Sequence, residues 1–334
     1  MRDVSNVPSP PGGSDADMPE NSGKPSPRTD LGYSPTGDPL SVNRAPPAEL
    51  SPWLARIYAT KMELSSDAVI SCGLLTDTPI LRVLFGGEWL AETRDGQRKF
   101  GPSALLFGPQ SRRMPVQTSS SFGTIGVCLK PGAVEALNGP KVEETLDQII
   151  NYDDIYSIKE WGSSQKIGEW FDPDGPVERW LRIAEILAGQ LIELTGGKRP
   201  DPVIEAFDKA VLANPNLNIG AFIEAHNIER RRFERLIKRA FGQNATKVLR
   251  RARALDLAAH LRGVADDDEA AEAALRFCDQ SHMIREFRAF LGMTPRQFAR
   301  TPQPFLTLNL EARQARRLEV LGRAEPGQPP PWRN

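Results

Sequence analysis

The sequence has little of several features on which secreted proteins, membrane proteins and metalloenzymes depend. Its 334 residues include three cysteines, and no two of them form a Cys-x-x-Cys pair. An odd number without such a pair argues against a disulfide framework and fits free thiols in a reducing cytoplasm. No apolar run approaches ~18 residues, and the N-terminal stretch has neither a basic region nor an apolar one after it. We therefore expect a cytoplasmic protein that does not contact a membrane.

Histidine is equally scarce, and this argues against catalysis. Metal-dependent barrels need clustered His and carboxylate ligands, yet the only histidines are His226, His260 and His282, all in the C-terminal third. No Ser-His-Asp or Cys-His arrangement can be assembled, and the phosphate-binding pattern G-x-x-x-x-G-K-[ST] is absent. We expect no catalytic residue, no metal ion and no cofactor.

Charge of either sign is nearly balanced over the whole chain, but the balance hides a basic segment. The formal net charge is -1, whereas residues 229–262 contain 11 Lys and Arg against 3 Asp and Glu. A local excess of that density on helical sequence predicts a polyanionic partner. Exposed charge runs are often no more than a solvated helix face, and this alternative stays open on charge alone.

Composition and turn residues divide the chain into five parts. Residues 1–47 are rich in Pro, Ser, Gly and Asp and predict a disordered arm. Short β-favouring runs between Gly and Pro turns predict a sensor-like β-rich domain over 48–165. An apolar stripe at helical spacing predicts a connecting or dimerisation helix over 175–197. Helical patterns fill 201–300, and a flexible tail is expected over 302–334.

The helical third contains an internal repeat. The segments "ERRRFERLIKRAFG" (Glu229 to Gly242) and "DQSHMIREFRAFLG" (Asp279 to Gly292) align without a gap at an offset of 50 residues. In each copy the apolar residues fall three or four apart, and the final Gly suits a left-handed helix cap. A short apolar helix and a turn precede each copy, which is the helix-turn-helix arrangement. Between the copies, residues 246–263 read as one linker helix of ~25 Å.

The second copy and its flanks resemble the DNA-binding domain of AraC/XylS-type transcription regulators. The motifs that carry the resemblance are "F-x-D-Q-S-H", "R-x-F" and "G-x-T-P" within residues 277–295, and residues 233–258 are similar to the family's first recognition helix and linker helix. The resemblance covers about 100 residues. The turn before the first recognition helix has Asn227 where the family usually has Gly, and Asn tolerates a left-handed backbone. The resemblance implies an α+β fold: a small antiparallel β barrel or sheet domain, then an all-α domain of two helix-turn-helix motifs joined by a linker helix.

Specific residues for DNA contact follow from the resemblance. The N-terminal residues of a recognition helix contact base edges, and Arg and Gln can bridge guanine and adenine respectively. The side chains expected to face DNA, with His282 expected chiefly to support the helix start or reach a phosphate, are Arg230, Arg231, Arg232, Arg235, Gln280, Ser281, His282 and Arg285.

The sequence therefore predicts a sequence-specific DNA-binding transcription regulator. Double-stranded DNA is the expected partner, and RNA polymerase, a small-molecule effector and a second copy of the chain are further candidates. Two alternatives remain: a DNA-binding protein whose N-terminal domain only mediates assembly, and a barrel enzyme fused to a DNA-binding module. The operator, the effector, the sign of regulation and the regulated genes cannot be derived from one sequence.

Overall fold

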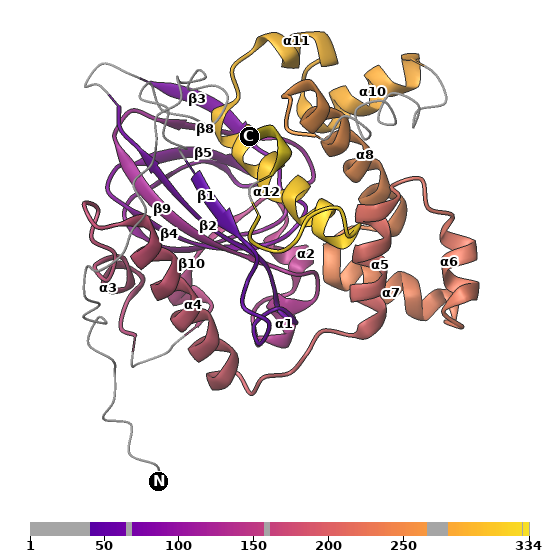
Figure 1. The fold of residues 1–334 in the computed structure, drawn as a ribbon, viewed down its shortest axis with the longest axis horizontal. Coiled ribbons are helices and arrows are strands. Elements are labelled where there is room, and N and C mark those ends of the chain that lie inside the picture. Colours follow the sequence, from indigo (N-terminus) through magenta and orange to yellow (C-terminus); the bar gives the residue numbers. More distant parts are fainter. Residues whose placement is uncertain (1–40, 65–68, 157–160, 266–279, 329, 334) are drawn as a thin grey trace.

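A β-rich N-terminal part and a helical C-terminal part lie against each other, in the order that the sequence predicted (Figure 1). The computed structural model describes residues 41–64, 69–156, 161–265, 280–328 and 330–333. Within these residues, no helix is both long enough and apolar enough to cross a membrane.

The larger of two sheets has six antiparallel strands in the order β1-β2-β9-β4-β7-β10. They are β1 Ser41–Arg44, β2 Leu54–Met62, β4 Ile80–Phe85, β7 Ser103–Phe107, β9 Phe122–Leu129 and β10 Ile149–Asn151. The central β9 is buried at every residue. A strand covered on both faces is apolar along nearly its whole length, and in β9 only Thr124 has a polar side chain.

The smaller sheet has four antiparallel strands in the order β3-β8-β5-β6. They are β3 Ile70–Leu74, β5 Trp89–Thr93, β6 Gly96–Phe100 and β8 Met114–Thr118. Buried and exposed residues alternate along β5, so one face of this sheet is turned inward. The inward side chains of the two sheets share one apolar core, to which Tyr58, Trp89 and Phe122 belong.

The expectation of a disordered arm over residues 1–47 is wrong for the C-terminal end of that range. Ser41–Arg44 form β1, which pairs with β2 at the edge of the larger sheet. Val42 packs on the core, and the Arg44 guanidinium forms ion pairs with Glu178 and Glu185 on a distant helix. A four-residue edge strand held by such long-range contacts has no periodicity that the sequence could reveal. Residues 1–40 lie outside the described residues.

Helix α4, Val177–Leu194, lies over the outer face of the larger sheet (Figure 1). Its apolar stripe is buried against the β domain, where the Trp180 and Phe85 rings meet edge to face with centroids 4.6 Å apart. The stripe that predicted a connecting or dimerisation helix is therefore covered by the β domain of the same chain. Shorter elements precede it: α1 Ala133–Ala136, α2 Val142–Thr145, η2 Tyr152–Asp154 and α3 Ser164–Gly168.

In the described part of the chain, six further helices of the C-terminal half precede α12 (Pro304–Val320). They are α5 Pro202–Ala213, α6 Ile219–Ala225, α7 Arg230–Phe241, α8 Ala245–Leu261, α10 Gln280–Leu291 and α11 Pro295–Arg300. Their starts follow local capping rules. The Asp201 carboxylate caps α5 ahead of Pro202 by accepting from the Val203 N–H at 2.9 Å, and Thr294 with Gln297 forms a capping box at α11. The expected helix before the second motif, residues 268–278, lies outside the described residues.

The tail expected over residues 302–334 contains a buried helix, α12 Pro304–Val320, followed by the 3₁₀ turn η3 Pro331–Arg333. Figure 1 shows α12 between the β domain and the helical part. Phe305 and Leu308 belong to the core between the two sheets, while Leu306 and Leu310 belong to the core of the second motif. The expectation of a flexible tail was wrong because buried arginines interrupt the apolar pattern of α12.

Candidate nucleic-acid interface

The first helix-turn-helix motif consists of α6, a turn at Asn227 and α7. Asn227 has a φ of 49°, the left-handed conformation expected for this turn residue. Phe233 and Ile237 of α7 are fully buried, and the Phe233 ring lies 5.8 Å from that of Phe222 on α6. Because one stripe of α7 is fixed in this core, the opposite stripe must face outward.

The predicted arginines of α7 lie on that outward stripe. Arg230, Arg231, Arg232 and Arg235 are all exposed. Arg232 is 3.5 Å from the Asp201 carboxylate, whereas the other three have no ion pair among the described residues. Three exposed guanidinium groups in the first half of a helix, two of them in its first turn, form the kind of surface that contacts phosphates and guanine edges.

The C-terminal end of α7 is turned toward the β domain instead. The Lys238 ammonium is 2.9 Å from the Glu143 carboxylate on α2, and Arg239 forms an ion pair with Glu135 on α1. Gly242 ends α7 with a φ of 69°, and a Cβ added there would meet the Val142 carbonyl oxygen at 3.2 Å. The last turn of α7 is therefore committed to contact within the chain.

Helix α10 has the same plan as α7. Phe287 and Leu291, the counterparts of Ile237 and Phe241, are fully buried, and Gly292 has a φ of 74° like Gly242. Ser281 and Arg285 are exposed. The alignment of the two copies thus corresponds to an equivalence in structure, with matched buried stripes and matched left-handed glycines.

The other two residues of α10 that were predicted to face DNA, His282 and Gln280, are not among its exposed side chains in the described structure. His282 is half-buried, with its Nδ1 3.6 Å from the Glu286 carboxylate one turn later, which fits a role in supporting the helix. Glu286 is 1% exposed and accepts hydrogen bonds from Arg253 on α8, the shorter at 2.9 Å. Gln280 is the first residue of α10, and its side chain lies outside the described residues.

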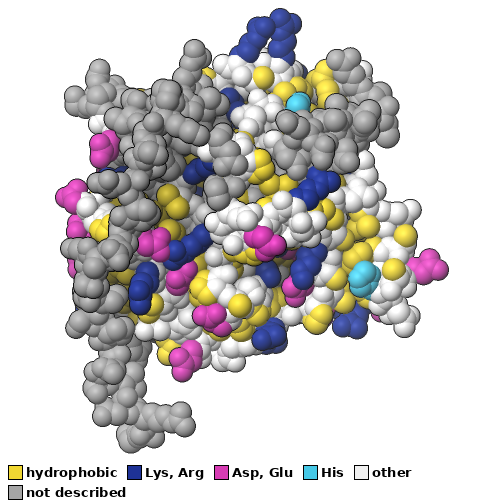
Figure 2. Space-filling view, viewed as in Figure 1, with side chains coloured by type: hydrophobic (Ala, Val, Ile, Leu, Met, Phe, Trp, Pro, Cys, Tyr) yellow, Lys and Arg dark blue, Asp and Glu magenta, His cyan; other side chains and the backbone are white. Residues whose placement is uncertain are grey.

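The basic segment 229–262 is only partly a surface for a polyanion. Arg251 is fully buried and donates to the carbonyl oxygens of Gln110 at 2.9 Å and Asp77 at 3.1 Å. Arg253 is tied to Glu286, and Arg262 donates to the Phe298 carbonyl oxygen at 2.8 Å. Arg251 is one of the basic residues from which a polyanionic partner was predicted, and for this residue the prediction was wrong. Figure 2 also shows basic side chains standing among acidic ones on the face it presents.

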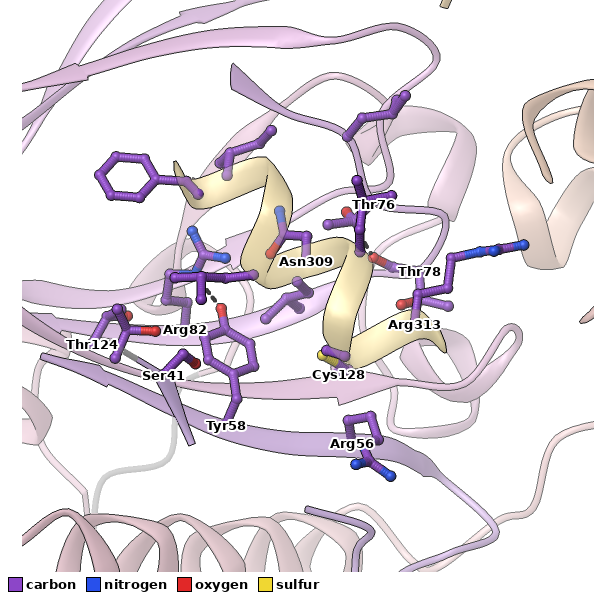
Figure 3. Close-up of a pocket in the computed structure, with 18 of the residues that line it drawn as sticks. Ser41, Arg56, Tyr58, Thr76, Thr78, Arg82, Thr124, Cys128, Asn309 and Arg313 are labelled. Carbon is purple, nitrogen blue, oxygen red and sulfur yellow. Dashed lines mark hydrogen bonds between the residues drawn. The ribbon is translucent and has the colours of Figure 1, made fainter. Parts of the chain in front are cut away.

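Sequence reasoning missed a cavity between the β domain and the helical part. Its walls come from β2, β4, β5 and β9 and from α12, and it contains the buried Arg82 (Figure 3). The signal was present in the charged residue at the centre of the strand "ILRVLF", because a cation in a buried strand is rare without a purpose.

Comparisons with known proteins give one family match and several solved structures. Residues 223–301 match the family described as a helix-turn-helix domain. No curated protein matches the chain. A lysine-to-alanine variant of apo ToxT from Vibrio cholerae strain SCE256 is 12% identical with a TM-score of 0.41, over 74% of this chain and 98% of that one.

Two further solved structures are similar at comparable identity. ToxT from Vibrio cholerae O395, bound to (E)-4-(8-methylnaphthalen-1-yl)but-3-enoic acid, is 10% identical with a TM-score of 0.42, over 73% of this chain and 98% of that one. The AraC-like transcriptional activator CuxR is 15% identical with a TM-score of 0.23, over 65% and 86%. The match over residues 223–301, on matched motifs centred on α7 and α10, confirms the AraC/XylS-type resemblance: this part of the chain is a helix-turn-helix domain.

Proposed function

We propose that the protein is a cytoplasmic, sequence-specific DNA-binding transcription regulator of AraC/XylS type, whose N-terminal β domain responds to a small-molecule effector. The observation that carries the proposal is the helix-turn-helix domain, in which α7 and α10 are equivalent helices with exposed arginines at matched positions. Arg235 and Arg285 are such a matched pair, since the two copies are offset by 50 residues.

Each exposed side chain has a role in the proposal that follows from its chemistry. Arg235 and Arg285 point outward from the middle of their helices and read guanine O6 and N7 or grip a phosphate. Arg230 and Arg231 precede Arg235 by about one turn and hold the backbone, and Ser281 does the same from α10. Gln280 bridges adenine N6 and N7, while Arg232 and His282 add phosphate contacts.

The linker helix α8 sets the separation of the two recognition helices, α7 and α10. Its 17 residues span ~25 Å at 1.5 Å per residue. Successive major-groove segments on one face of B-form DNA repeat at ~34 Å, and two helices tilted on a linker of that length can enter neighbouring segments. One chain would then read two successive major-groove segments of one site.

RNA polymerase and a second copy of the chain are further partners in the proposal, and no enzymatic activity is included. The stripe of α4 that suggested a dimer is covered by the β domain, so a homodimer must use another surface. The rival in which the β domain only mediates assembly predicts that no metabolite changes DNA affinity. The enzyme rival predicts turnover in a substrate screen.

Selection from a random double-stranded DNA library with the full-length protein tests the proposal. We expect an enriched sequence motif, and we expect Arg235→Ala and Arg285→Ala each to weaken binding to it by about 1–3 kcal/mol, or roughly 5- to 150-fold. Arg98→Ala serves as the control, since Arg98 is an exposed arginine on β6. Equal affinity of all three variants and the wild type at physiological salt would refute the assignment of Arg235 and Arg285.

A further inference from the structure

Arg82 is a buried cation for which the described residues provide no counter-charge. It is 3% exposed, and it rises from β4 into the cavity toward α12 (Figure 3). Among the described residues no carboxylate lies within 4.0 Å of it, and no group of the protein accepts from its Nη1. Taking a guanidinium out of water without an anion costs several kcal/mol, so this arrangement needs an explanation.

The groups around Arg82 do not neutralise it. Its Nε donates to the Tyr58 hydroxyl at 2.7 Å, and its guanidinium carbon lies 4.2 Å from the centre of the Phe107 ring. Burial raises the pKa of Tyr58 to about 12, although Arg82 itself opposes that shift. The phenol is therefore neutral at physiological pH. Burial likewise raises the pKa of the Cys128 thiol to about 12, so that group is neutral too.

The other arginines around the cavity all have acidic partners. Arg56 forms an ion pair with Glu319, and Arg316 forms one with Asp208. Arg313 is held between Asp77 at 2.8 Å and Asp256 at 2.5 Å. Asp77, the one acid among the described residues of the cavity wall, is thus already engaged. Arg82 differs from its neighbours in leaving one positive charge uncompensated within the cavity.

Further polar groups of the cavity wall also lack partners in the described part of the chain. They are the Trp89 Nε1, the Thr124 Oγ1, the Asn309 Nδ2 and the Arg313 Nη2. Together with the Arg82 Nη1, four of these five atoms are N–H donors that cannot accept a hydrogen bond, and the fifth is a hydroxyl that can do either. A buried wall made chiefly of unused donors matches a molecule rich in acceptors.

We propose that this cavity binds a small-molecule monocarboxylate, with the carboxylate on Arg82 and an apolar body against the rings of Trp89, Phe122 and Phe305. One free guanidinium matches one negative charge, and a carboxylate supplies acceptors in the planar geometry that arginine prefers. The stacked Trp89 and Phe305 rings, 5.0 Å apart, and Phe122 provide the apolar surface. The cavity volume of about 60 Å³ fits the carboxylate end of such a molecule, since a single water needs about 10–15 Å³ on the same scale.

The site joins the two parts of the protein, because Asn309 and Phe305 belong to α12. Leu306 and Leu310 of the same helix are in the core of the second helix-turn-helix motif. A carboxylate on Arg82 therefore contacts a helix that is continuous with the DNA-binding part. This deepens the effector role in the proposed function and, as far as regulation is concerned, rests on it. The binding itself does not require DNA.

Calorimetric titration of the full-length protein tests the proposal. The probes are acetate, butyrate, hexanoate and benzoate, each compared with its neutral amide. We expect at least one carboxylate to bind tenfold or more tightly than its amide. In Arg82→Met this preference should vanish, in Arg82→Lys it should return in part, and in the control Arg98→Met it should be unchanged, because Arg98 is exposed on β6.

The melting temperature of the unliganded protein distinguishes a ligand-binding arginine from a structural one. If Arg82 is kept for a ligand, Arg82→Met replaces an uncompensated buried charge by an apolar side chain, so the melting temperature should stay level or rise. Failure of every carboxylate to exceed its amide would overturn the proposal. A strong fall in the melting temperature of Arg82→Met, with carboxylate binding retained, would overturn it as well.

The experiments distinguish a failure of carboxylate binding from a failure of the proposed DNA-binding function. Carboxylate binding by a protein that selects no DNA motif would contradict the regulator while leaving the Arg82 site intact. Selection of a DNA motif by a protein that prefers no carboxylate over its amide would do the reverse. Both measurements use the same full-length preparation.

Discussion

The C-terminal helix α12 offers a direct perturbation of the contact between the two parts of the protein. Phe305 is 4% exposed, stacks on Trp89 at 5.0 Å and meets Phe122 edge to face at 5.6 Å. Replacing it by alanine removes a buried ring and two aromatic contacts. Phe→Ala substitutions in cores cost about 3–5 kcal/mol, of which aromatic pairs contribute about 0.5–1.5 kcal/mol each beyond their buried area. We expect Phe305→Ala to reduce stability within that range.

Leu306→Ala is the matched variant, because the next residue of α12 points into the other core. Leu306 is fully buried in the cluster that contains Phe287 and Phe298, and Leu→Ala costs about 2–5 kcal/mol. The two variants should differ in where protection is lost. Native-state hydrogen exchange should show faster exchange in β5 and β8 for Phe305→Ala, and in α10 and α11 for Leu306→Ala.

Two outcomes would refute this reasoning: an almost unchanged stability of Phe305→Ala, or the same pattern of hydrogen exchange in both variants. If Phe305→Ala changed the free energy of unfolding by less than about 1 kcal/mol, α12 would not be held by the β domain as its contacts indicate. If both variants accelerated exchange equally in both parts, the two cores would unfold as one unit.

Three other variants test separate contacts. Arg251→Met should lower stability by about 1–3 kcal/mol for each carbonyl oxygen left without its donor, and should leave the salt dependence of DNA binding unchanged. Arg230→Ala should instead leave stability unchanged and reduce the slope of log affinity against log salt concentration by about 1. Burial alone would raise the pKa of Asp77, but Arg313 and Arg251 lower that pKa below its ordinary value of 3.8. The contribution of Asp77 to stability is therefore present above pH ~4 and is lost as the pH falls below that. In thermal melts, the stability of Asp77→Asn should depend less on acid than that of the wild type. Burial raises the thiol pKa values of Cys72 and Cys128 to about 11 and about 12, so with Cys278 replaced by serine the folded protein should resist thiol reagents at pH 8 and react only when unfolded.

The sequence predicted the helix-turn-helix domain because its signals are local. Apolar spacing, the left-handed glycines Gly242 and Gly292 and the capping pairs at Asp201 and Thr294 each depend on a few neighbouring residues. The order of the β strands was not predictable in the same way, since β9 pairs with β2 and β4, and β2 lies some 60 residues earlier in the chain. Pairing of that kind is set by the whole core.

Charged residues misled the sequence analysis for one physical reason. A solvated and a buried arginine look alike in a sequence, because what distinguishes them is a partner far along the chain. Arg251 counted toward the basic segment that predicted a polyanionic partner, yet its acceptors are at positions 77 and 110. Arg316 in the expected tail is likewise buried against Asp208. Arg82 stood out as a charged residue within "ILRVLF", but the sequence could not show that segments as distant as residues 41 and 316 enclose a cavity around it.

The ion pairs of α12 bear on how a ligand in the cavity would influence the DNA-binding part. Arg313 joins Asp77 of the β domain to Asp256 of α8, and Arg316 joins α12 to Asp208 of α5. Separating any one of these buried pairs would leave uncompensated charges and cost about 3–5 kcal/mol. Small independent displacements of α12 are therefore unfavourable, and the helix keeps its position or shifts to another discrete one with its acidic partners. Allosteric coupling requires an element with two discrete arrangements. If α12 has a second one, a carboxylate on Arg82 that binds the two unequally would favour one position of α12 and thereby one position of the second helix-turn-helix motif.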